Sequence, residues 1–161
     1  MPSRSTLAAL FLVIGSALSP VAAQSNDHPS HDSGFAHMQQ RGKEAMGVDQ
    51  YTSFHHFDDL RDGGRIELQR DSSDTAGVRV IRDHLRSIAR SFSEGDFSVP
   101  GFVHSEEVPG TATMRQKQSV IQYRFAPLPG GGEVRIVTHD PAAISAVHAF
   151  LAYQRREHRT S

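Results

Sequence analysis

Hydrophobic and polar residues alternate along two pairs of short segments, and an amphipathic segment follows each pair. In the first copy Phe57 lies seven residues before Gly64, and in the second Phe125 lies seven residues before Gly132. Both copies fit one degenerate repeat of strand, Gly-rich turn, strand and helix. The repeat predicts the order ββαββα, with the four strands in one antiparallel sheet.

The first strand is expected over residues 51–57 and carries two adjacent histidines, His55 and His56. Successive side chains of a strand point to opposite faces of the sheet, so these two imidazoles cannot lie side by side. In the repeat His55 corresponds to Tyr123, on the apolar face of the third strand, and His56 corresponds to Arg124. We therefore predict that His55 is inside and His56 is in solvent.

Both strands that follow the glycine turns are apolar on one face and charged on the other, as in an antiparallel sheet with one wet face. A first helix is expected from Asp74, a favourable N-cap, to a stop at Gly95, and a second begins at Asp140-Pro141. Their apolar stripes contain Val78, Ile81, Leu85, Ile88 and Phe92 in the first helix and Ile144, Val147 and Leu151 in the second. Both helices should cover the apolar sheet face, which predicts a two-layer α+β sandwich.

The connection over residues 96–115 is longer than compact domains commonly use. Its apolar residues indicate that it packs onto the domain, and residues 111–118 fit a short helical turn. Packed long loops often carry function.

The chain begins with a basic residue, an apolar run and small residues, the plan of a secretory signal peptide over residues 1–23. Residues 24–48 are polar and are predicted to be a flexible N-terminal segment, whose His28, His31 and His37 would bind metal only adventitiously. Residues 49–161 then form one domain. We expect a periplasmic or secreted protein with no membrane association after signal cleavage.

Composition narrows the classes of function. The 161 residues include no cysteine, which excludes thiolate catalysis, iron–sulfur clusters and Cys-based zinc sites. The formal net charge is −1 and the basic residues form no block, so the sequence gives no sign of nucleic-acid binding. No G-x-S-x-G, H-E-x-x-H or phosphate-binding helix start occurs, so no catalytic or organic-cofactor residue is predicted and a non-enzymatic role is favoured.

A transition-metal site is the most specific functional hypothesis. His55 from the sheet, His84 and His148 from the helix margins, and His104 from the long connection border one layer of the predicted fold. Imidazole is a ligand for zinc and copper, and the thioether of Met114 would favour copper, particularly Cu(I). Met46 is the alternative thioether.

Two other interpretations stay open. These histidines can also be hydrogen-bonded structural residues, which is the commoner role of a histidine at the edge of a core helix, and none has a tight ligand spacing. The chain would then be a metal-free periplasmic module that binds a protein or a small apolar ligand through the long connection and Phe54. A homodimer formed by the outer face of the sheet is compatible with both.

The motifs of residues 46–160 together resemble a family of short, secreted bacterial proteins with no established activity. The family pattern has Phe where Val48 stands and two threonines where Ser53-Phe54 stands. The residues that carry the resemblance are Met46-Gly47, His55-His56-Phe57, Asp62-Gly63-Gly64, Ile81-Arg82-Asp83-His84-Leu85, Gly95-Asp96-Phe97, Val103-His104, Pro109-Gly110, Met114, His148-Ala149-Phe150-Leu151 and Glu157-His158. The resemblance implies export from a bacterial cell and no particular chemistry.

Overall fold

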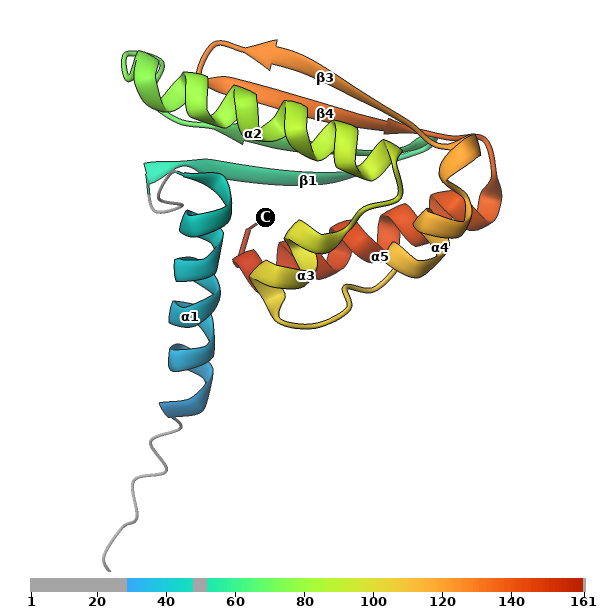
Figure 1. Ribbon diagram of the computed structural model, residues 1–161, viewed down its shortest axis with the longest axis horizontal. Coiled ribbons are helices and arrows are strands. Elements are labelled where there is room, and N and C mark those ends of the chain that lie inside the picture. Colours follow the sequence, from blue (N-terminus) through green and yellow to red (C-terminus); the bar gives the residue numbers. More distant parts are fainter. Residues whose placement is uncertain (1–28, 48–51, 161) are drawn as a thin grey trace, which may run out of the picture.

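The computed structural model describes residues 29–47 and 52–160 (Figure 1). Its elements are α1 (Pro29–Met46), β1 (Phe54–Leu60), β2 (Gly63–Gln69), α2 (Thr75–Ser93), α3 (Ser98–His104), α4 (Thr111–Gln116), the 3-10 helix η2 (Gln118–Val120), β3 (Gln122–Leu128), β4 (Gly131–Val137) and α5 (Pro141–His158). The expected signal peptide, residues 1–23, lies outside the described residues. None of the helices over the described ranges is both long and apolar enough to cross a membrane.

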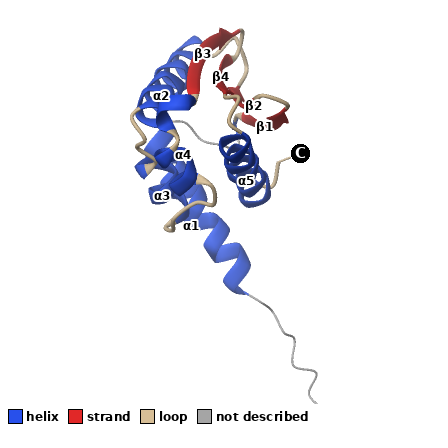
Figure 2. Cartoon of the chain, turned by 90° about the vertical axis from the view of Figure 1, so that its right-hand side faces the viewer, coloured by secondary structure: helices blue, strands red, loops and turns tan. Residues whose placement is uncertain are grey.

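The sheet has the strand order β1-β2-β4-β3, and every neighbouring pair is antiparallel. Helices α2 and α5 lie on the same side of this sheet (Figure 2). The predicted α+β sandwich with the order ββαββα is confirmed. Helices α1 and α3 are added to the two predicted helices and the predicted helical turn.

Each long helix covers the hairpin of the other repeat. Helix α2 packs on β3 and β4, whereas α5 packs on β1 and β2. The two repeats are thus interleaved, and neither can bury its apolar sheet face without the helix of the other. Their side chains form a single core around Ile81, Leu85, Val134 and Leu151.

The first strand lies three residues later than predicted. The first strand was expected over residues 51–57 but forms over Phe54–Leu60, because Leu60 pairs with Gly63 and only two residues form the turn. Gly64 is therefore inside β2, where a Cβ atom would collide with the Leu151 side chain of α5. The glycine at position 64, which was predicted to be part of the turn, instead allows the helix to approach the sheet closely.

Local signals placed the helix ends correctly. The Asp74 side chain accepts a hydrogen bond from the Gly77 amide at 3.0 Å, and Asp140 accepts one from the Ala143 amide at 3.0 Å. Helix α2 ends at Ser93, and Gly95 follows with a φ of +75°. The face prediction for the first strand is also confirmed, because His55 is 8% exposed whereas His56 is exposed.

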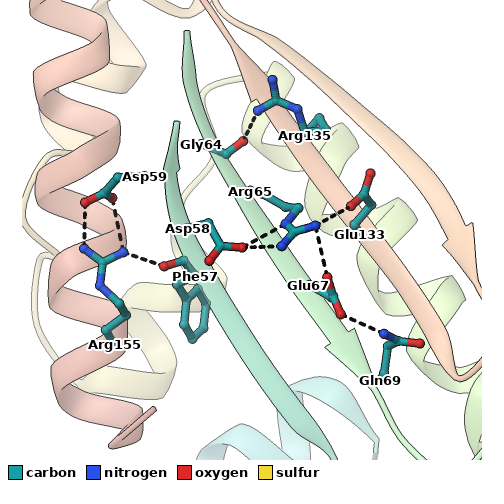
Figure 3. A network of polar contacts seen from close by, with 10 residues as sticks. All are labelled: Phe57, Asp58, Asp59, Gly64, Arg65, Glu67, Gln69, Glu133, Arg135 and Arg155. Carbon is teal, nitrogen blue, oxygen red and sulfur yellow. Dashed lines mark hydrogen bonds and ion pairs between the residues drawn. The ribbon is translucent and has the colours of Figure 1, made fainter. Parts of the chain in front are cut away.

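The outer face of the sheet carries a network of ion pairs (Figure 3). Arg65 lies 2.6 Å from Asp58, 3.4 Å from Glu67 and 3.6 Å from Glu133. At the β1 edge Arg155 of α5 forms a 2.8 Å ion pair with Asp59 and donates a hydrogen bond to the Phe57 carbonyl. The charged residues are partly exposed, in agreement with the predicted wet face.

The N-terminal segment differs from its prediction. Residues 24–48 were expected to be flexible, but Pro29–Met46 form helix α1, whose C-terminal half contacts α3. The buried residues Met38, Gly42 and Met46 are four apart and lie on one helix face. Arg41 adds a 2.8 Å hydrogen bond from its Nε to the carbonyl of Val103. The four-residue spacing of Met38, Gly42 and Met46 is present in the sequence, but the polar residues around it led to the prediction of a flexible segment.

The long connection packs onto the domain as predicted. It contains α3 and α4, and Phe97, Val103, Val108 and Met114 are buried. The expected helical turn at residues 111–118 corresponds to α4 and the start of η2.

Candidate functional site

A cavity of about 80 Å³ lies where α1, β1, β2, α2, α3 and α5 meet. Most of its wall is aliphatic or aromatic: Gly42, Ala45, Met46, Phe57, Ile66, Leu68, Leu85, Ile88, Phe92, Val99, Pro100, Val103 and Phe150. The remaining lining residues are four histidines, His55, His84, His104 and His158, and the amide side chain of Gln154. We call these four residues the histidine cluster.

The four imidazoles come from four different elements. His55 is on the inner face of β1 because its neighbours Phe54 and His56 point outward. His84 is at the margin of the buried stripe of α2, and His104 is the last residue of α3. His158 is the last residue of α5. The cluster therefore exists only in the folded chain.

Three of the four rings of the cluster contact one another. His55 and His158 stack with ring centroids 5.4 Å apart, and His104 meets His158 edge-on at 5.2 Å. Phe57 extends the stack, with its ring 6.0 Å from His55. The three imidazoles therefore form a continuous row along the cavity wall, in the spatial order His104, His158, His55.

Hydrogen bonds orient the other ends of two imidazoles. His104 Nε2 lies 3.2 Å from Gln154 Oε1, and an amide oxygen only accepts, so this nitrogen carries the hydrogen. The lone pair of His104 is then on Nδ1. His84 is hydrogen-bonded to the backbone of Ala45 in α1. Each bond ties one ring nitrogen to the protein.

Burial makes the neutral imidazole the stable form throughout the cluster. Desolvation lowers the pKa of His55 and of His84 to about 4, and that of His158 to about 3. Repulsion from neighbouring histidines adds to the lowering of the pKa for His55 and His158. The pKa of His104 is also lowered by burial, although the bond to Gln154 opposes the change. Within residues 29–47 and 52–160, no Asp, Glu, Lys or Arg side chain lines the cavity.

The structure brings together three of the five predicted metal ligands. His55, His84 and His104 line the cavity, but His148 and Met114 do not. His148 Nε2 lies 2.9 Å from the carbonyls of both Leu60 and Gly63, where it fastens α5 to the β1–β2 turn. Met114 is fully buried in α4.

Two cavity residues with His or Met side chains, His158 and Met46, were not part of the predicted set. His158 was grouped with the basic residues at the chain end, yet it lies seven residues after Leu151 and four after Gln154. It therefore continues the buried stripe of α5, which the helical period alone indicates. Met46 was only the alternative thioether, and helix α1 brings it to the cavity wall.

Over residues 29–47 and 52–160, no three His, Asp or Glu side chains are arranged as a ready-made metal site. The cluster is a set of neighbouring imidazoles around a space, without converged nitrogen atoms. Searches against protein-family models, curated proteins and solved structures match nothing to this chain. The resemblance to short secreted bacterial proteins therefore stays a prediction.

Proposed function

We propose that this protein is an exported, non-enzymatic binding protein for a transition metal ion, copper or zinc, and that the histidine cluster holds the ion. The observation that carries the proposal is the meeting of four neutral imidazoles from four elements in one cavity. Neutral imidazole is the ligand form that zinc and copper require, so proton competition at neutral pH would be small.

The hydrogen bonds behind two of the imidazoles support this function. Metal-bound histidine commonly donates its other ring N–H to a carbonyl or carboxylate group, which fixes the ring and its tautomer. His104 has such a partner in Gln154 Oε1, and His84 has one in the backbone of Ala45. Binding would require the imidazoles to turn toward a common centre, and the cavity of about 80 Å³ provides the space.

Equilibrium dialysis of the untagged chain against Cu and Zn tests the proposal. A background in which His28, His31 and His37 are replaced by Asn removes adventitious N-terminal binding. The expected result is one ion per chain, with loss of binding in His55→Phe and His158→Phe, since phenyl rings preserve the stacking but supply no nitrogen. His56→Ala is the matched control and should bind as the background does.

A metal-free module for a small uncharged ligand is the second candidate. The cavity wall is mainly apolar, and Gln154 Nε2 is buried with no hydrogen-bond partner. A buried donor of this kind favours a ligand with one acceptor atom. Absence of metal binding in the background chain, together with a melting temperature that rises with phenol, would support this candidate and reject the metal proposal.

A further inference from the structure

Among residues 29–47 and 52–160, the groups of the cavity wall that could contact an ion are electrically neutral. Four imidazoles, the thioether residue Met46 and the amide of Gln154 are the polar or polarisable groups of the wall. None of them carries a negative charge. Glu106 and Glu157 act electrostatically on His104 but do not line the cavity.

A wall without anions discriminates between ions by charge. The cost of moving an ion from water into a medium of low dielectric constant grows with the square of its charge, so a monovalent ion incurs roughly a quarter of the cost of a divalent one of equal size. Neutral imidazoles also form zinc sites, but without a carboxylate or thiolate they leave the double charge of Zn²⁺ or Cu²⁺ uncompensated. Cu(I) is monovalent, and it prefers soft ligands such as thioethers.

We infer that the ion held by the histidine cluster is Cu(I), and that Met46 is its thioether ligand. This inference rests on the proposed metal-binding function and adds the oxidation state and one ligand. Met46 is in the last turn of α1 and lines the same cavity as His55 and His84. His84 is hydrogen-bonded to the backbone of Ala45, the residue before Met46, so the C-terminal end of α1 contacts the cluster.

The two carboxylates outside the cavity, Glu106 and Glu157, are placed where they would attract a cation toward His104. Glu106 accepts a hydrogen bond from the hydroxyl of Tyr153, whose ring meets His104 edge-on at 5.0 Å. Glu106 and Glu157 both favour a positive charge near His104, the cluster member whose pKa they act on. They would attract a cation toward His104 without entering its coordination.

Anaerobic titrations measure both ions on the same protein. The chain with Asn at positions 28, 31 and 37 is titrated with Cu(I) against bicinchoninate and with Zn(II) against a chromophoric zinc chelator. We expect Cu(I) to bind more tightly than Zn(II). Met46→Leu should weaken Cu(I) binding roughly tenfold or more, the scale on which a lost supporting group is felt at metal sites, and should leave Zn(II) unchanged.

Met114→Leu and Met38→Leu are matched controls, because both residues are buried methionines that do not line the cavity. Zn(II) binding as tight as Cu(I) binding, or Cu(I) binding unaffected by Met46→Leu, would overturn the inference while the metal-binding function stands. Failure of both ions to bind would instead reject the proposed function. Circular dichroism of each variant distinguishes a lost ligand from a lost fold.

Discussion

His55 in the first strand and His158 at the end of the last helix stack with ring centroids 5.4 Å apart and 21° between their planes. The contact joins the edge strand β1 to α5 beside the cavity. In this stack each imidazole covers a face of the other. The stack is therefore a structural feature of the domain in addition to its role in the proposed site.

Replacing His55 with Ala should lower the free energy of unfolding by about 1–3 kcal/mol, because a buried ring with stacked partners is removed. Replacing His56 with Ala should change it by no more than about 0.5 kcal/mol, as is usual at exposed positions. Urea denaturation of the two variants provides the comparison. Equal effects would contradict the assignment of the two faces.

Acid should destabilise the protein well before its carboxylates titrate. The pKa values of His55 and His84 are lowered from 6.5 to about 4, and that of His158 to about 3, so the unfolded chain binds protons that the folded chain does not. Stability is therefore complete above about pH 6.5 and falls as the pH decreases toward 4, by about 3 kcal/mol for one such histidine.

Urea unfolding at pH 7.5, 6 and 5 measures this dependence. The decrease in the free energy of unfolding from pH 7.5 to 5 should be smaller in His55→Phe, which has no group to protonate at position 55. A free energy of unfolding that stays constant between pH 7.5 and 5 would show that the cluster accepts protons without loss of the fold.

Gly64→Ala should destabilise the domain by about 1–3 kcal/mol, because the added methyl group meets the Leu151 side chain of α5 and must displace it. Gly34→Ala is the matched control, since no atom lies within 4 Å of the new methyl group in helix α1. Alanine is the better helix former, and a gain of up to about 1 kcal/mol is expected there. Thermal melts of both variants test the contrast.

Asp140→Ala should cost about 1 kcal/mol, because it removes the N-cap of α5. It also removes a 2.7 Å ion pair with Lys117, whose contribution is small at a partly exposed site. Asp83→Ala, which removes an exposed 2.8 Å pair with Arg86 and no cap, should have almost no effect. If the two variants lost similar amounts of stability, the effect of Asp140→Ala would come from the lost ion pair and not from the lost N-cap.

The sequence alone determined those features that depend on neighbouring residues. Strand alternation placed His55 inside and His56 outside, and the N-cap chemistry of Asp74 and Asp140 located the starts of both long helices. The repeat predicted the four-stranded sheet because each copy must hide one apolar face. The helical period also continues to His158, although the basic residues around it obscured that signal.

Only the tertiary structure decided which distant residues meet. Periodicity identifies the buried face of a helix but not the hairpin on which it packs. Here α2 packs on the hairpin of the second repeat, and α5 packs on the hairpin of the first. This packing brings His148 against the β1–β2 turn and leaves Met114 away from the cavity. Helix α1, through its contact with α3, brings Met46 to the cavity instead. Such choices depend on the shapes of surfaces far apart in the chain, which no local pattern of residues specifies.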